Sequence, residues 1–103
     1  MDIELNYQRL YPVTINHKVQ AHHCKNVIET VLGADNFDNT LEPSMGGEDF
    51  AYMLEKVPGA YICVGNGDSA GLHNTSYDFN DEIIPVGISY WLELVNSRLH
   101  INN

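Results

Sequence analysis

The chain contains apolar residues at helical spacing in three segments. From about Asn16 to Leu32 they recur every three or four positions, which predicts a helix with one apolar face. Its members are Cys24, Val27, Ile28 and Val31. We expect Asn16 to cap the first turn with its side-chain oxygen and Gly33 to end the helix in a left-handed conformation. One side of this helix should therefore pack in a core.

Two later segments also have the spacing of helices. The first should run from Gly47 to Lys56 and end at Pro58, with its apolar face formed by Phe50, Met53, Leu54 and Val57. The second should start around Pro85, a residue that is well tolerated at the first helical position. One stripe follows along it: Ile84, Ile88, Trp91, Leu92, Val95 and Leu99. We expect this stripe to be a packing face.

Two other segments have the patterns of β-strands. Residues 3–7 alternate apolar and polar side chains, which is the period of a half-buried strand. Residues 60–64 (AYICV) form a short continuous apolar run between turn residues, typical of a strand buried on both faces. Nothing before residues 3–7 in the sequence offers them a hairpin partner, so their partner must come from elsewhere. The fold class that we predict is α/β, or α+β for the chain as an isolated fragment.

The charge of the chain narrows the classes of partner. Among 103 residues, 14 acids face 5 bases, and the net charge is -9 at pH 7. Nucleic-acid binding depends mainly on basic residues that neutralise phosphates, so we exclude a nucleic-acid partner. The same balance argues against an anionic membrane surface, and no stretch approaches the roughly 20 apolar residues of a membrane helix.

The two cysteines and the N-terminal sequence bear on the compartment. Cys24 and Cys63 lack CxxC spacing and have apolar neighbours, which predicts buried free thiols. The first residues, MDIELNYQRLYP, lack the basic start, apolar run and cleavage site of a signal peptide. The expected setting is cytoplasmic.

Candidate chemistry lies between Leu41 and Asp81. His73 follows the predicted buried strand and a Gly/Asn/Asp/Ser loop, where open α/β sheets bind ligands, and a neutral imidazole can bind a metal. The alternative is an exposed or hydrogen-bonded loop histidine. Glu48 and Asp49 offer a general base or metal-bridging carboxylates. They also suit a helix N-terminus, and this simpler interpretation is favoured from local sequence.

Other motifs are absent or poorly spaced. The histidines His17, His22 and His23, with Cys24, do not have the spacing of three or four that brings ligands to one helix face. We therefore expect surface histidines. No GxSxG, P-loop, HExxH or paired CxxC occurs in the sequence.

Several short motifs, taken together, resemble a known family. Their order is Tyr11-Pro12 with Asn16, Met45-Gly46-Gly47-Glu48-Asp49-Phe50, Val57-Pro58-Gly59-Ala60, Leu72-His73-Asn74 and Tyr77-Asp78-Phe79-Asn80-Asp81. This order resembles the C-terminal part of the metal-dependent amidohydrolases that include hippurate hydrolase, N-acyl-amino-acid deacylases and auxin-conjugate hydrolases. The similarity covers nearly the whole chain. Each motif alone is weak, and the set with its intervals is more specific.

The resemblance implies a two-part organisation. Residues 1–39 would be the C-terminal end of a lid or dimerisation domain, a strand plus a helix, and residues 40–103 would be the C-terminal helix, strand, loop and helix of a zinc-peptidase-like catalytic domain. The complete enzymes of this family hold two divalent metal ions, typically zinc, and His73 matches their last metal ligand. Gly46, Gly47, Glu48 and Asp49 would shape the substrate site.

The resemblance also implies that parts of the site are absent from these 103 residues. The other metal ligands and the general base of the family lie in an upstream segment with a Cys-x-His and a Glu-Glu pair, which this sequence lacks. A catalytic zinc needs three protein ligands. We expect no catalytic residue within this chain, no metal retained by it alone and no hydrolysis of N-acyl amino acids without the missing ligands.

The alternative hypothesis is a non-catalytic α+β interaction module. Under both hypotheses, the exposed edges and apolar faces of so short a chain favour a homo-oligomer or a domain swap.

Overall fold

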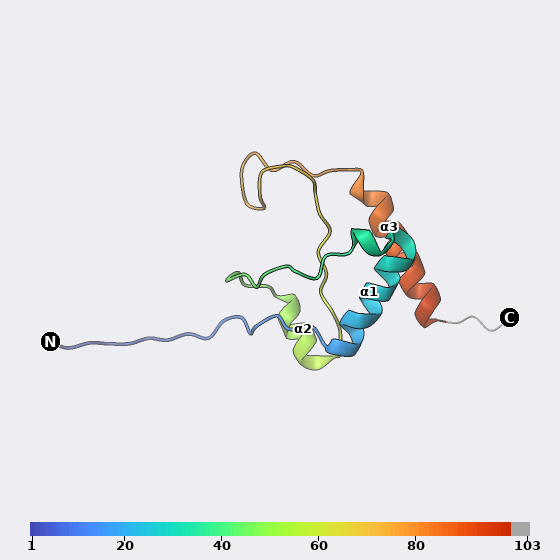
Figure 1. The fold of residues 1–103 in the computed structure, drawn as a ribbon. Helices are drawn as coiled ribbons and strands as arrows, with labels where there is room; N and C mark the ends of the chain where they lie inside the picture. The colour runs from blue at the N-terminus through green and yellow to red at the C-terminus, as the bar shows by residue number, and fades with distance from the viewer. Residues whose placement is uncertain (100–103) are drawn as a thin grey trace.

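The structure is a computed structural model that describes residues 1–99, and its regular elements are helices (Figure 1). They are α1 (Lys18–Leu32), the short 3-10 helix η1 (Ala34–Asn36), α2 (Phe50–Lys56) and α3 (Ile83–Arg98). The three predicted helices are confirmed. Helix α2 begins at Phe50 rather than Gly47, and α3 begins at Ile83, shortly before Pro85.

The predicted fold class, α/β or α+β, is wrong. Residues 1–99 contain no strand, so the described part of the chain is all-helical with long irregular connections. A strand needs a neighbouring strand to bind its N–H and C=O groups, and neither predicted segment has one here. Residues 3–7 extend away from the helices, and Leu5 is 85% exposed (Figure 1). In residues 60–64, Tyr61 bonds through its backbone to a side chain instead of a strand.

Helix α1 starts after His17 and ends at Gly33, and its N-cap differs from the predicted one. His17 takes the N-cap position and no side chain caps the helix, so the prediction that Asn16 caps it was wrong. At the other end Gly33 ends the helix, as expected, with φ 86°, a value that side-chain-bearing residues rarely adopt. Its ψ of 152° lies outside the left-handed helical region, so that part of the prediction was wrong. Lys25 and Glu29, one turn apart, form a half-buried ion pair at 3.7 Å.

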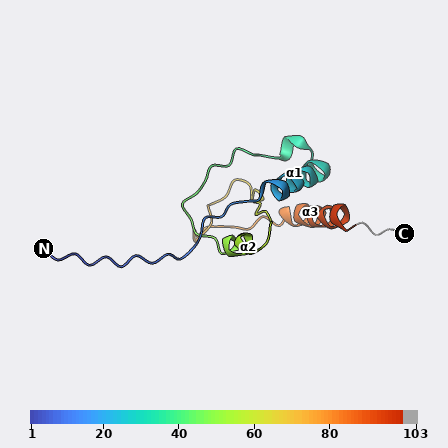
Figure 2. The same cartoon turned by 90° about the horizontal axis from the view of Figure 1, so that it is seen from below.

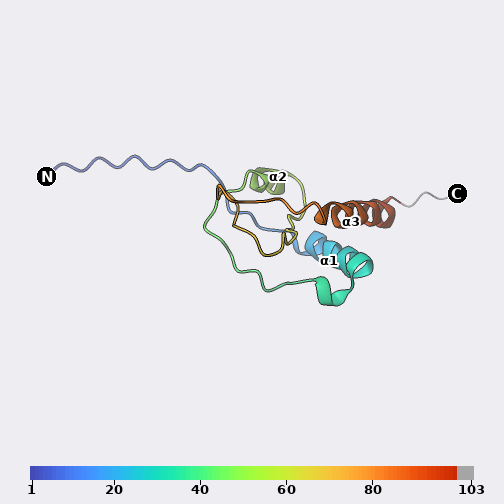
Figure 3. The same ribbon diagram turned by 90° about the horizontal axis from the view of Figure 1, so that it is seen from above.

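The main core lies between α1 and α3, which run side by side in all three ribbon views (Figures 1, 2 and 3). Cys24, Val27 and Tyr90 are buried there, with partly buried Ile28 and Leu94 against them. Burial, together with a hydrogen bond and the charge of the Cys24 thiolate, raises the pKa of the Tyr90 phenol far above its ordinary value. The apolar face predicted for α1 is the one that α1 buries.

A smaller buried site belongs to α2, where Ala51 is 0% and Leu54 6% exposed. The rest of the face predicted for this helix is less buried, since Met53 is 62% and Val57 65% exposed. Helix α2 lies apart from the α1 and α3 pair (Figure 2). The buried apolar side chains are therefore few and fall in two places.

The stripe predicted to pack α3 is exposed instead. Its members are between 49% and 67% exposed: Ile84, Ile88, Trp91, Leu92, Val95 and Leu99. Tyr90 and Leu94, on an adjacent face, contact α1. Helix α3 has apolar residues around much of its surface, and a single neighbouring helix covers only one side of it. Cys63, predicted to be a buried thiol, is also exposed.

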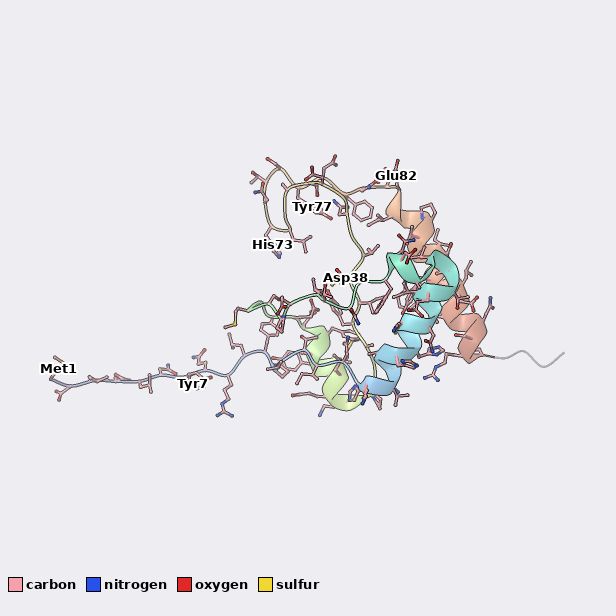
Figure 4. The ribbon with its side chains drawn as sticks, in the orientation of Figure 1. Met1, Tyr7, Asp38, His73, Tyr77 and Glu82 are labelled. Carbon is pink, nitrogen blue, oxygen red and sulfur yellow. The ribbon has the colours of Figure 1, made fainter. Side chains whose placement is uncertain are left out.

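The described chain is elongated, measuring 72 × 36 × 22 Å. Its radius of gyration is 17.9 Å, whereas about 13 Å is typical of a compact domain of about 100 residues. The N-terminal segment points away from the helices, and the loop that carries His73 lies on the opposite side of the molecule from α2 (Figures 1 and 4). This shape keeps the two ends of the 41–81 segment apart.

Candidate functional site

The front of the candidate site is the start of α2. Glu48 Oε1 accepts a hydrogen bond from the Phe50 backbone N–H at 3.1 Å, so this carboxylate satisfies one of the free donors of the helix N-terminus. Asp49 occupies the N-cap position without a side-chain capping bond and is exposed. The two adjacent acids therefore differ, because Glu48 is half-buried and fixed while Asp49 faces water.

Glu48 also contacts a residue that the sequence did not single out. The negative charge of Glu48 and a hydrogen bond to it are the main causes that raise the pKa of the Tyr61 phenol, with smaller contributions from burial, Cys63 and Asp49. The Phe50 and Tyr61 rings pack with centroids 5.5 Å apart. The sequence held no signal for this pair, because the apolar run around Tyr61 indicated a strand.

The glycine pair before Glu48 has one close neighbour. A Cβ on Gly47 would lie 3.1 Å from Tyr11 Cδ2, so the missing side chain lets the Tyr11 ring pack on the backbone. A Cβ on Gly46 would meet only Ser44 Oγ, at 3.9 Å. The ring of Tyr11 in turn packs against Tyr52 of α2, with centroids 5.7 Å apart. Gly47 thus allows the N-terminal segment to lie against the start of the site.

The back of the candidate site is a loop organised by Asn66. Its Oδ1 accepts the Asn80 N–H at 2.8 Å, and its Nδ2 donates to the Asp78 carbonyl at 2.7 Å and to Ser69 Oγ at 3.0 Å. These bonds close a loop whose tip carries His73 with φ 66°, an uncommon conformation for a residue other than glycine. His73 is exposed and points away from α3 (Figure 4).

The described residues do not form a metal site by themselves. Among residues 1–99, no group of three or more His, Cys, Asp or Glu side chains lies close enough together to bind a metal ion. His73 is one imidazole, whereas a catalytic zinc takes three protein ligands and a water. The donor set of residues 1–99 alone therefore does not fit a catalytic metal.

The other three histidines within residues 1–99 do not lie together. His17 Nδ1 accepts the Gly59 N–H at 3.0 Å, His23 Nε2 lies 3.0 Å from Ser97 Oγ, and His22 is exposed. His22 lies on the surface as expected, whereas His17 and His23 are half-buried, so the prediction of surface histidines was wrong for these two. The partners of His17 and His23 lie 42 and 74 residues away in sequence, beyond what spacing within one helix can predict.

An open hollow of about 610 Å³ lies between α1, α3 and residues 59–62. Its walls are mainly aromatic and aliphatic, including Tyr61, Tyr90 and Trp91, and its polar groups include His23 and Arg98. Because Tyr61 lines it, the hollow borders the Glu48 and Tyr61 pair.

None of the described helices has the length and apolar character needed to cross a membrane.

Comparison with known proteins gives matches along most of the chain. Residues 2–97 match the model of peptidase family M20/M25/M40. Hippurate hydrolase of Campylobacter jejuni is 31% identical over 94 residues, covering 91% of this chain and 24% of that protein. IAA-amino acid hydrolase ILR1-like 4 of Arabidopsis thaliana is 32% identical over 106 residues, covering 90% of this chain and 24% of that protein.

A third relative is N-acetyldiaminopimelate deacetylase of Streptococcus suis, 32% identical over 88 residues, covering 85% of this chain and 23% of that protein. The chain therefore spans about a quarter of the length of these relatives. No solved structure matches it. The family is generally metal-dependent, and its named members here act on amide bonds of small amino acid conjugates. On the match over residues 2–97, this chain belongs to peptidase family M20/M25/M40.

Proposed function

We propose that this chain is the C-terminal portion of an amidohydrolase that cleaves the amide bond of small N-acyl amino acids. The observation that carries the proposal is the match of residues 2–97 to the family, together with relatives named for hippurate and IAA-amino acid hydrolysis. A divalent metal, zinc in the first instance, would supply the activation of water. His73 is the one residue of this chain that we assign to it, and the other ligands come from polypeptide outside these residues.

The geometry of the loop supports this role for His73. The Asn66 hydrogen bonds hold the two ends of the loop together, and they leave the imidazole exposed at the tip. An exposed neutral imidazole can donate a nitrogen lone pair to a metal that is bound by other side chains. Gly46, Gly47, Glu48 and Asp49 would shape the substrate side, where Glu48 is already held by the Phe50 N–H.

The exposed stripe of α3 fits an incomplete structural unit. Trp91 and Leu92 are 62% and 61% exposed, and they adjoin the open apolar hollow. In the complete enzyme, we assign this surface to packing against the remainder of the catalytic domain. Residues 1–39 would belong to the lid or dimerisation domain and residues 40–103 to the catalytic domain, although residues 100–103 lie outside the described part.

A chimera tests the proposal. The matching quarter of Campylobacter jejuni hippurate hydrolase is replaced by this chain, and zinc content and glycine release from hippurate are measured. We expect hydrolysis in the chimera, with loss of zinc and activity in the His73→Ala variant. The control is His22→Ala, which removes an exposed histidine of α1 and should change neither. A chimera that folds but binds no zinc would contradict the proposal.

The second candidate is an interaction module without catalysis, favoured by the same exposed apolar side chains. It would act through homo-oligomers or a domain swap. Sedimentation analysis of the chain at tens of micromolar gives the first test, since a concentration-dependent dimer is expected and a monomer at all concentrations contradicts the module. Hydrolysis by the chimera separates the two candidates.

A further inference from the structure

Three hydrogen bonds of one carboxamide close the loop that carries His73. Asn66 Oδ1 accepts the Asn80 N–H at 2.8 Å. Asn66 Nδ2 donates to the Asp78 carbonyl at 2.7 Å and to Ser69 Oγ at 3.0 Å. The two bonds of Nδ2 need an N–H donor, which a carboxylate at this position lacks. Closure of the loop therefore depends on residue 66 remaining an amide.

The residue after Asn66 is a glycine that the conformation of the loop requires. Gly67 has φ 85°, a conformation in which a residue with a side chain is strained. Asn66 is the one asparagine in the sequence that precedes a glycine. A following glycine makes an asparagine most reactive, because its backbone rotates freely and no Cβ hinders the approach of its nitrogen to the carboxamide. The conformation that closes the loop thus places the most reactive neighbour beside the amide that holds it.

The closed loop restrains this reaction, and little keeps the loop closed. Its hydrogen bonds hold the Asn66 carboxamide in place while they are made. However, residues 65–81 contain no buried side chain, and Asn66 itself is only half-buried. Segments without buried apolar contacts open locally at a low cost in free energy. In the open loop the carboxamide is released, and the Gly67 nitrogen can reach it.

We propose that the Asn66-Gly67 step is a site of spontaneous deamidation, which converts Asn66 to an acid and opens the loop that carries His73. The Gly67 nitrogen attacks Asn66 Cγ and gives its proton to water. The new N–Cγ bond replaces the Cγ–Nδ2 bond, and the amide nitrogen takes up a proton and leaves as ammonia. Water then cleaves the five-membered imide ring at either carbonyl, which gives aspartate or isoaspartate. The net reaction consumes one water and releases one ammonia, with no oxidation or reduction.

Neither product can restore the closed loop. The atom that replaces Nδ2 accepts hydrogen bonds and cannot donate them, so it faces the Asp78 carbonyl oxygen without a hydrogen between them. The new charge also enters a loop that already carries Asp68 and Asp78, and like charges repel. Isoaspartate further adds one carbon to the backbone. The effect on metal binding through His73 rests on the proposed function, whereas the reaction and the opening of the loop belong to these residues alone.

Mass spectrometry of the 103-residue chain tests the reaction. The chain is incubated without denaturant at mildly alkaline pH and digested, and the aspartate and isoaspartate forms of each asparagine-containing peptide are separated and measured over time. Asn66 should convert at least about tenfold faster than Asn74, an exposed asparagine of the same loop that precedes a β-branched threonine. Equal rates at the two residues, or conversion of Asn66 only in urea, would overturn the proposal.

The Asn66→Asp variant, which reproduces one product, tests the opening of the loop in the chain without metal. The ¹⁵N order parameter of the His73 amide should fall from the range of ordered backbone, about 0.85, to below about 0.6. The control is Asn74→Asp, which adds the same charge to the same loop. It keeps an acceptor for the Ser76 N–H, which Asn74 Oδ1 binds at 2.8 Å, and should leave the order parameter unchanged.

The remaining outcomes separate loop opening from other effects. The proposal is overturned if the order parameter of His73 is the same in Asn66→Asp as in the unchanged chain, or if it falls equally in the control. Hydrogen exchange of the buried Val27 amide should not change in Asn66→Asp. Lost protection there would mean that residue 66 serves overall stability, which also overturns the proposal. A chimera that folds without hydrolysing hippurate would refute the proposed function and leave these results unaffected.

Discussion

The small core between α1 and α3 predicts a strong dependence of stability on one valine. Val27 is 3% exposed in α1, and Val19 on the same helix is 71% exposed. Each Val→Ala substitution removes the same two methyl groups and gives the same small gain in helix propensity, of up to about 0.7 kcal/mol. The difference between the two variants therefore isolates the effect of burial.

The magnitude follows from the buried carbon atoms. Removing two buried methyl groups costs about 1.6 kcal/mol at about 0.8 kcal/mol each, and a void that neighbouring side chains do not fill adds about 1 kcal/mol. We expect Val27→Ala to lower the free energy of unfolding by about 2 to 3 kcal/mol relative to Val19→Ala. Small domains have only about 5 kcal/mol or somewhat more in total, so the loss is large.

The assay is urea denaturation followed by circular dichroism at 222 nm, which reports the helices directly. Val19→Ala should unfold at the same urea concentration as the unchanged chain or slightly above it, and Val27→Ala should unfold at a clearly lower one. Equal midpoints for the two variants would refute the burial of Val27 between α1 and α3. A difference below about 0.5 kcal/mol, the range of ordinary surface substitutions, would refute it as well.

Three further predictions concern pH, thiols and glycines. Because the pKa of Tyr90 is raised in the folded state, its contribution to stability is present below about pH 10 and is lost as pH rises above that value. The Tyr90→Phe substitution should flatten this alkaline loss of stability in denaturation curves. An unchanged pH profile of stability in this variant would count against the raised pKa of Tyr90. Ellman's reagent should modify exposed Cys63 quickly and buried Cys24 only at the rate of local opening, so equal rates would contradict the assigned burial. The Gly33→Ala substitution, at φ 86°, should lower the free energy of unfolding by about 1 kcal/mol. The Gly87→Ala substitution within α3, where a Cβ has open space, should raise it by about 0.5 to 1 kcal/mol. If both variants shift thermal unfolding in the same direction, the conformations assigned to the two glycines are contradicted.

Local sequence signals predicted the helices well and the long-range contacts poorly. The spacing of Cys24 and Val27 identified the buried face of α1, and Gly33 marked its end, because both depend on residues within one or two turns. The strand at residues 60–64 was wrong because an apolar run does not reveal whether a partner strand is present. The prediction that the stripe of α3 is a packing face was wrong for the same reason, since an apolar face shows which residues can be buried and not which element covers them.

In the candidate site, too, local features could be predicted and long-range contacts could not. The position of Glu48 and Asp49 at a helix start followed from their place before an apolar helical segment. Asn16 was assigned to a helix cap, because asparagine is common there, while its true partner Tyr61 lies 45 residues away. The roles of His73 and of residues 46–49 in metal and substrate binding stay predictions. Spacing within one element cannot reveal a carboxamide that takes the place of a neighbouring strand.

Four hydrogen bonds connect the side chain of Asn16 to the Tyr61 backbone, and the His17 N–H and Nδ1 to the Gly59 backbone, and they close a long stretch of chain at little net gain in free energy. Their partners are 42 to 45 residues apart, and closing a flexible loop of that length costs about 3 kcal/mol. Four hydrogen bonds at about 1 kcal/mol each offset roughly this amount. The junction between the N-terminal helix and residues 59–61 is therefore close to balance and can open and close without unfolding the α1 and α3 pair, which gives residues 1–17 and α2 a built-in point of relative movement.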